Sequence, residues 1–163
     1  MGLVEYWLDS NVFIEGRNGP YGFDLAPRFW TVLEEMSDAD LLACPELVYC
    51  ELSDVQDDLV DWAKKHKDMF VDPDADVQQE FKKVAAYVVY RYPDNQSRRR
   101  FLDGADPWVI AHSIAKGGAA VTHEPKDPEN SNKVKIPNVC DNFDVRCIDV
   151  YQMLRDQKIS WTR

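Results

Sequence analysis

The sequence predicts an α/β fold in which helices pack against a parallel sheet. Short apolar segments of strand length alternate with longer segments of helical periodicity along the chain. The 163 residues are the size of one domain, and a hydrophobic content of 45% is enough for a packed core. We therefore expect a single domain over residues 1–163. The expected strands cover residues 4–9, 41–44, 69–71, 119–122 and 145–148.

The first third of the chain is expected to hold two helices after its first strand. Ser10 or Asn11 suits the N-cap of a short helix that runs to about residue 15. Glycines and a proline make residues 16–24 a loop. A helix over residues 25–36 follows, because its apolar residues recur at helical spacing. These residues are Phe29, Trp30, Val32, Leu33 and Met36.

Three helices are expected in the middle of the chain. Pro45 suits the first turn of a helix that ends near Leu52, and another helix covers residues 56–67. The longest helix covers residues 75–92, and Pro93 ends it because proline disfavours a helical residue before it. Its expected apolar side consists of Phe81, Val84, Ala85, Val88 and Val89.

The last third is expected to contain three helices and one long loop. Pro107 begins a helix that runs to Lys116, and the two glycines at 117–118 end it. The polar residues 123–135 form an exposed loop or flap. Short helices follow at residues 137–143 and 150–157.

The charge of the chain constrains its partners. The formal net charge is −10, so most of the surface repels nucleic acid unless basic groups are concentrated locally. The same charge suits a basic protein partner. No apolar run of about 18 residues is present, and the first residues lack the pattern of a signal peptide. We expect no membrane span and a cytoplasmic location.

The four cysteines do not match a metal or redox motif. Separations of six residues within the first pair and seven within the second fit neither a zinc knuckle nor C-x-x-C. We expect buried free thiols. The four residues are Cys44, Cys50, Cys140 and Cys147.

Four acidic residues follow or begin predicted elements and are the candidate site. Asp9 follows the first strand, Glu51 lies on the apolar face of a helix, Asp106 precedes Pro107, and Glu124 follows the fourth strand. Functional groups gather at the carboxyl ends of parallel strands, so we expect these carboxylates to meet there. Clustered carboxylates suit a hard cation such as Mg²⁺ or Mn²⁺, which can assist phosphodiester hydrolysis.

Structural explanations compete with this interpretation. Asp9 and Asp106 could each cap a helix, the latter with proline at the first helical position. Glu51 could lie at the edge of its apolar stripe, where a charge is solvated. The segment that precedes Asp106 also contains Asp103, which could support the site, bind the cation or be solvated.

Polar and basic neighbours could complete the site. Ser10, Asn11 and Thr122 lie beside the predicted acids and could support them. Three consecutive arginines just before Asp103 could bind substrate phosphates, although such runs are more often solvated. These are Arg98, Arg99 and Arg100, and three lysines (Lys126, Lys133 and Lys135) lie on the predicted flap.

Four segments in order resemble the PIN-domain family, which includes VapC-like toxin ribonucleases. Residues 8–14 resemble its opening D-[ST]-[NS] segment, and residues 48–52 its helical glutamate motif. Residues 106–113 resemble the D-x-x-I-A-A motif, and residues 121–124 the V-T-x-D motif. The similarity extends over about residues 4–150.

The resemblance implies a three-layer α/β/α sandwich with a parallel sheet of about five strands. It also implies a metal-dependent ribonuclease with Asp9, Glu51, Asp106 and Glu124 at its catalytic metal site. Its implied partners are an RNA substrate, an antitoxin protein and a second copy of the chain. Two departures stand out: the fourth acid is glutamate instead of aspartate, with Pro125 after it, and the chain is longer than most such toxins.

Two other functions remain open from the sequence. The same fold could serve as a non-catalytic module that binds a basic protein. A haloacid-dehalogenase-like phosphotransferase would need a second aspartate at the position of Asn11, and an amide cannot act as its general acid.

Overall fold

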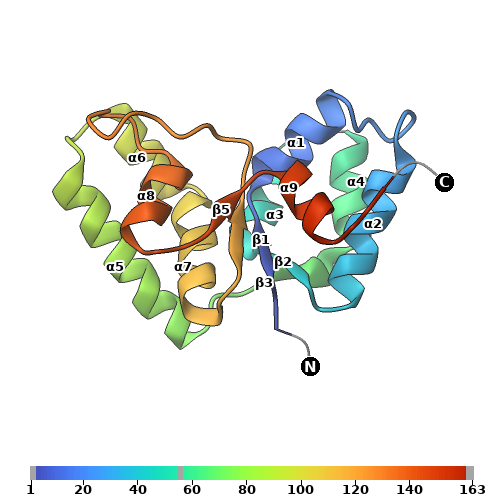
Figure 1. The fold of residues 1–163 in the computed structure, drawn as a ribbon, viewed down its shortest axis with the longest axis horizontal. Helices are drawn as coiled ribbons and strands as arrows, with labels where there is room; N and C mark the ends of the chain where they lie inside the picture. Colours follow the sequence, from blue (N-terminus) through green and yellow to red (C-terminus); the bar gives the residue numbers. More distant parts are fainter. Residues whose placement is uncertain (1–2, 55–56, 161–163) are drawn as a thin grey trace.

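The sheet at the centre of the protein confirms the predicted α/β class. In the computed structural model, which describes residues 3–54 and 57–160, five strands pair in parallel in the order β3-β2-β1-β4-β5 (Figure 1). The pairs place Tyr6 beside Leu42 and Ala119, so β1 lies at the centre. The strands are β1 (Tyr6–Leu8), β2 (Leu42–Pro45), β3 (Phe70–Val71), β4 (Ala119–Val121) and β5 (Cys147–Ile148).

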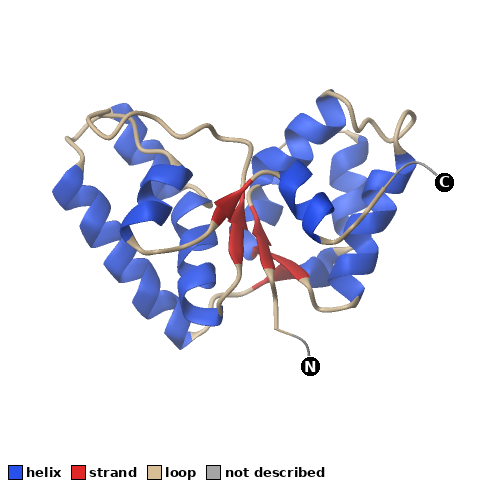
Figure 2. Ribbon diagram, in the orientation of Figure 1, coloured by secondary structure: helices blue, strands red, loops and turns tan. Residues whose placement is uncertain are grey.

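Helices cover both faces of this sheet, as expected for a three-layer sandwich. One group packs on one side and the other on the opposite side, with the strands between them (Figure 2). The first group is α1 (Ser10–Asn18), α2 (Pro27–Asp38), α3 (Glu46–Ser53), α4 (Asp58–Lys65) and α9 (Val150–Asp156). The second group is α5 (Ala75–Arg91), α6 (Gln96–Asp103), α7 (Asp106–Lys116) and α8 (Ile136–Asn142).

The two layers have separate apolar cores because side chains alternate along the strands. Tyr6 and Leu8 of β1 point into the core shared with α1, α2, α3 and α4. Trp7 points into the other core, beside Val109 and Ile110 of α7. Burial on both faces explains why the strands are continuously apolar.

A histidine is buried beneath Trp7 in the second core. The ring of His112, which is 1% exposed, stacks on the indole of Trp7 at 4.4 Å between centroids. In the described part of the chain, neither ring nitrogen has a hydrogen-bond partner. The pKa of His112 is lowered to about 4, chiefly by burial, with smaller effects from Asp74, which raises it, and Lys116, which lowers it. The imidazole is therefore neutral at pH 7.

Several helices and strands begin or end at other residues than the sequence predicts. Asp9 itself caps α1, and that helix continues to Asn18, past the expected loop start at residue 16. α2 begins at Pro27 and not at Leu25, which is 76% exposed. Pro45 ends β2 and is the N-cap of α3, so it lies just before the first turn of the helix and not in it. The expected start of the fourth helix at residue 56 lies outside the described residues, and the described helix begins at Asp58.

Helix α6 was not predicted, and Val89 was wrongly assigned to the core. Only Phe101 of α6 is buried, so the segment shows no apolar periodicity. Asn95 starts the helix by accepting a hydrogen bond from the amide of Arg98 at 2.8 Å. Val89 is 52% exposed because α5 buries only one narrow face, through Val77, Val84 and Val88.

The thiols are all free, but not all are buried. Cys44 and Cys140 are buried, whereas Cys147 is half-buried and Cys50 is exposed on α3. The expectation of a buried thiol was therefore wrong for Cys50, which faces solvent on the outer side of its helix. Among the described helices, none has the length and apolar character needed to cross a bilayer.

Candidate functional site

Asp9 lies buried at the carboxyl end of the central strand. Its Oδ1 accepts a hydrogen bond from the amide of Ser10 at 2.8 Å, and its Oδ2 accepts one from the hydroxyl of Thr122 at 3.1 Å. The residue is only 3% exposed. Helix capping is thus a role of Asp9 and not of Ser10 or Asn11. One oxygen of Asp9 caps α1, and the other is held by Thr122, which follows β4. Asp9 therefore lies between β1 and β4, at the switch point where the strand order of the sheet reverses.

Glu51 reaches the same region from α3. Its Oε2 accepts a hydrogen bond from Ser10 Oγ at 2.5 Å, and its Oε1 accepts one from the amide of Ala105 at 2.7 Å. A Cβ atom on Gly104 would lie 3.2 Å from Oε1, so glycine allows this close approach. The partners of Glu51 come from the start of α1 and the start of α7, and they fix its carboxylate between the two helices.

Asp106 is the first residue of α7, and the N-cap position belongs to Ala105. The competing explanation that Asp106 caps the helix therefore does not hold. Its carboxyl group shares a hydrogen bond with that of Asp9. Burial, followed by the charges of Asp9, Glu124 and Glu51, raises the pKa of Asp106 to about 9. The two carboxyl groups therefore share a proton at neutral pH.

Glu124 approaches from the loop after β4. Its Oε2 accepts a hydrogen bond from the amide of Ile136 at 2.8 Å, at the start of α8. Its own amide donates to Thr122 Oγ1 at 3.1 Å. Burial raises the pKa of Glu124 above its ordinary value. Burial also raises the pKa of Asp9 to about 7, with further contributions from the charges of Glu124 and Glu51.

These four carboxylates form an electrostatic cluster, but they are not drawn into a closed ligand cage. In the described residues, no group of three or more His, Cys, Asp or Glu side chains is arranged to hold a metal ion. Charges act on one another over several ångströms, whereas oxygen ligands lie about 2.0–2.6 Å from Mg²⁺ or Ca²⁺. The donor chemistry fits a hard divalent cation, and binding one would require the oxygens to move closer together.

Three of the expected supporting residues lie in this site. Ser10 links Asp9 to Glu51, and Thr122 links Asp9 to Glu124. Asn11 joins the same network: its side-chain nitrogen lies 3.1 Å from Thr122 Oγ1, and its Oδ1 accepts from the amide of His123 at 3.2 Å. Asp103 is exposed at the end of α6, and in the described part of the chain no hydrogen bond or ion pair joins it to the cluster.

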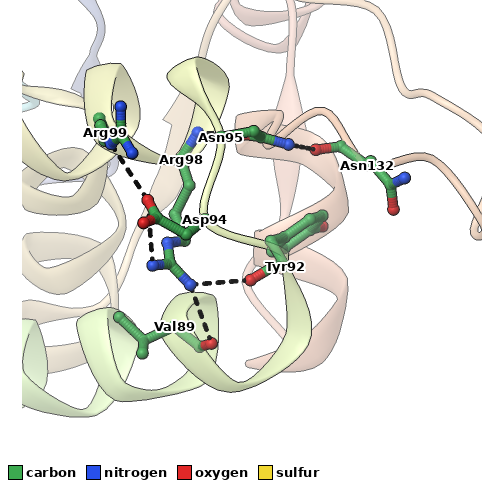
Figure 3. A network of polar contacts seen from close by, with 7 residues as sticks. All are labelled: Val89, Tyr92, Asp94, Asn95, Arg98, Arg99 and Asn132. Carbon is green, nitrogen blue, oxygen red and sulfur yellow. Dashed lines mark hydrogen bonds and ion pairs between the residues drawn. The ribbon is translucent and has the colours of Figure 1, made fainter.

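The arginines sit on α6, where two of them make local contacts. Arg98 donates to the carbonyl of Tyr92 at 3.0 Å and pairs with Asp94 at 3.3 Å (Figure 3). Arg99 pairs with the same Asp94 carboxylate at 3.0 Å. The guanidinium of Arg98 is thus held at the α5–α6 junction, whereas Arg100 is exposed. Asn95 donates to the carbonyl of Asn132, which anchors the long loop to this junction.

The lysines of the loop also differ in their contacts. Lys126 pairs with Asp141 of α8, and Lys133 is exposed. Residues 123–135 form an irregular segment, as expected, but the amide of Val134 donates to Ser97 Oγ at 2.9 Å and its side chain is buried. The loop is therefore fastened to α6 near its end.

Backbone groups complete the site, and side-chain patterns in the sequence do not indicate them. The amides of Ala105 and Ile136 hold two of the four carboxylates. The glycine at 104 and the proline at 137 are weak signals of a close approach and of a helix start, respectively.

The comparisons with known proteins give a family but no activity. No curated protein matches the chain. A family model described as "Domain of unknown function (DUF4411)" matches residues 6–161, nearly the entire chain and all the elements that build the site. The chain therefore belongs to the DUF4411 family.

Proposed function

We propose that the protein is a PIN-type endoribonuclease that depends on Mg²⁺ or Mn²⁺. The observation that carries this proposal is the cluster of Asp9, Glu51, Asp106 and Glu124 at the switch point of a parallel sheet. Besides burial, the charges of Glu51 and Glu124 contribute to the raised pKa values of Asp9 and Asp106, and this repulsion destabilises a site that stays empty. A divalent cation relieves that repulsion.

Asp9, Glu51 and Asp106 would hold the cation, directly or through water, and Glu124 would complete the set. The cation supplies a means of activating water and of stabilising charge on the phosphate oxygens. The amide of Ser10 and the hydroxyl of Thr122 keep Asp9 in place, and the amide of Ala105 does so for Glu51. The amide of Ile136 holds one oxygen of Glu124, which leaves the other to orient the attacking water.

The wider proposal follows the resemblance to VapC-like toxins. The substrate is RNA, the location is cytoplasmic, and the partners are an antitoxin protein and a second copy of the chain. The net charge of −10 supports a basic partner. Because the acidic surface repels RNA, exposed cations such as Arg100 and Lys133 would contact the phosphates near the site.

The test is cleavage of a mixed RNA pool by the purified protein with Mn²⁺, Mg²⁺ or a chelator. We expect cleavage that requires the metal and that chelation removes, because the carboxylates alone cannot offset the charge of the transition state. Sequencing of the product ends would identify the preferred site. Metal binding without cleavage of any RNA in the pool would contradict a broad ribonuclease.

The alternative is a non-catalytic module that binds a basic protein. The absence of a closed ligand cage in the described residues favours it. Calorimetric titration with Mn²⁺ separates the two. A module with this fold would bind no metal, and its partner would still bind when Asp9 is neutralised.

A methyl group at position 104 offers a second, subtler test. The added Cβ of Gly104→Ala would lie 3.2 Å from Glu51 Oε1 and from the carbonyl of Arg100, so the carboxylate must shift by a few tenths of an ångström. We expect a roughly tenfold loss of Mn²⁺ affinity and of cleavage, since misplacing such groups typically costs 10–100-fold. Calorimetry and initial rates measure both.

Gly16→Ala is the matched control for this substitution. Its added Cβ meets only the side chains of Phe29 and Tyr21, at 3.4 Å or more, and lies outside the carboxylate network. Equal Mn²⁺ affinities for the two variants would mean that Glu51 does not bind the cation.

A further inference from the structure

Two cysteines from different elements pack in the same apolar cluster beside the carboxylate site. Cys140 is on α8, and Cys147 is on β5, the edge strand. The chain turns back between them, since the amides of Phe143 and Val145 both donate to the carbonyl of Cys140 at 3.0 Å. Both side chains pack in the same apolar cluster, and interaction with Cys147 raises the pKa of Cys140 far above its usual range. The sequence does not indicate this proximity, because the spacing of the two residues fits no redox motif.

The two sulfurs differ in access to solvent. Cys140 is fully buried, whereas Cys147 is half-buried and lines a cavity of about 360 Å³. Thr122 and Glu124 line the same cavity, so it adjoins the carboxylate cluster. The volume is ample for a small oxidant, since one water occupies about 30 Å³ of liquid. Cys147 is therefore the sulfur that an oxidant reaches first.

We propose that Cys140 and Cys147 are a site of reversible disulfide formation. A peroxide is the oxidant class that fits the cavity. The sulfur of Cys147, as thiolate, attacks one peroxide oxygen, the O–O bond breaks, and the released hydroxide takes up a proton to become water. The sulfur of Cys140 then attacks that of the Cys147 sulfenic acid, the S–O bond breaks, and the Cys140 proton leaves with the hydroxyl group as a second water. In total, the two thiols lose two electrons and two protons to one hydrogen peroxide.

The packing of the two cysteines supports this order of events. Interaction with Cys147 and burial both raise the pKa of Cys140 far above its usual range, so Cys140 stays protonated until its partner is oxidised. Because both side chains pack in one cluster, the second step has a high effective concentration. Intracellular disulfides of this kind are typically transient and redox-sensing.

Helix α8 connects the pair to the candidate site. Ile136 begins this helix and its amide holds Glu124 Oε2 at 2.8 Å, while Cys140 lies one turn further along. A covalent bond is shorter than the contact between two thiols, so oxidation draws α8 and β5 together and shifts the Ile136 amide. The expected effect on cleavage rests on the proposed nuclease function, whereas formation of the disulfide does not.

The first test is chemical and needs no activity. The reduced full-length protein is treated with hydrogen peroxide, free thiols are alkylated, and peptides are identified by mass spectrometry. We expect a cross-linked peptide joining Cys140 to Cys147, two hydrogens lighter than the pair, which dithiothreitol reverses. Cys50→Ser, which removes the exposed thiol, should retain the cross-link, whereas Cys147→Ser and Cys147→Ala should lose it. Oxidation of Cys50 while Cys140 and Cys147 remain thiols would overturn the proposal.

The second test measures the coupling to Glu124. In the disulfide form, amide hydrogen exchange at Ile136 should speed up at least severalfold, because its hydrogen bond to Glu124 is weakened. Cleavage of RNA should fall in parallel and return on reduction. A disulfide that forms while Ile136 exchange stays unchanged would overturn the coupling. Altered exchange in a protein that cuts no RNA even when reduced would contradict the nuclease function and leave the redox pair established.

Discussion

Asp9→Asn is expected to abolish RNA cleavage while making the metal-free protein more stable at pH 8. The loss of activity follows from the removal of a charged ligand: losing about 4 kcal/mol of transition-state stabilisation lowers a rate roughly a thousandfold. The fold should survive, because asparagine can also cap α1 and accept from Thr122. Initial rates with Mn²⁺ measure the first effect.

The gain in stability follows from the raised pKa of Asp9. Its folded-state pKa is about 7 against an unfolded value of 3.8, so the folded protein holds the proton more tightly. The contribution of Asp9 to stability is therefore complete below pH 3.8 and is lost as the pH rises through 7. At pH 8 this loss is at most about 4 kcal/mol. Urea unfolding of both proteins in chelator at pH 8 measures the difference.

A matched control is Asp38→Asn, which neutralises an exposed acid at the end of α2. It should change neither cleavage nor the pH dependence of unfolding. Full cleavage by Asp9→Asn would show that Asp9 is not part of the catalytic site. An unchanged stability at pH 8 would mean that burial and the neighbouring charges do not raise the pKa of Asp9 in the folded protein.

His112→Phe is expected to stabilise the protein in acid by about 3 kcal/mol. The pKa of His112 is about 4 in the folded state and 6.5 in the unfolded chain, so the unfolded chain takes up a proton that the folded state resists. Its contribution to stability is full above pH 6.5 and is lost as the pH falls toward 4. Phenylalanine keeps a ring on Trp7 and removes two unpaired nitrogens.

Unfolding midpoints in urea from pH 4 to pH 8 test this expectation. The gain in stability of His112→Phe over the wild type should be largest at pH 4. Little of the pH-dependent part of that gain should remain at pH 8. His66→Phe is the control, because His66 is partly exposed at the end of α4 and pairs with Glu34. A gain for His112→Phe that is equal at every pH would show that packing, and not protonation, produces it.

Together His112 and Asp9 predict an unusual dependence of stability on pH for the wild type. Between pH 4 and pH 6.5, the His112 contribution rises with pH while the Asp9 contribution falls, so they oppose each other. Above pH 6.5 the His112 contribution is constant, while Asp9 and Asp106, with pKa values of about 7 and about 9, continue to titrate and stability falls. Adding Mn²⁺ at pH 8 should recover much of that loss.

The sequence predicted the sheet because its three inner strands are buried on both faces and therefore uniformly apolar. It also placed Asp9, Glu51, Asp106 and Glu124 at element ends that the topology brings to one edge. It could not predict α6, whose polar residues lack periodicity, or the exposure of Val89, which depends on how narrow a face α5 buries.

The details of the site depend on long-range contacts that leave no local signal. Glu51 is held by the amide of Ala105, which lies 54 residues away, and such a donor can be any residue. Arg98, Arg99 and Arg100 were predicted to contact phosphates because they precede Asp103. The sequence pattern did not indicate that Arg98 and Arg99 pair with Asp94 near the α5–α6 junction. The proximity of Cys140 to Cys147 likewise depends on the turn between α8 and β5.

The position of β1 at the centre of the sheet has a consequence for biosynthesis. Its two neighbours are β2, made soon after it, and β4, made more than a hundred residues later. Parallel pairing over such a separation forms slowly, and chains emerge from the ribosome from the N-terminus onward. A nascent chain that has emerged only through α5 carries Asp9 and Glu51 but lacks Asp106, Thr122 and Glu124. Under the proposed nuclease function, the carboxylate site would therefore be complete only after the last third of the chain has emerged and joined the sheet.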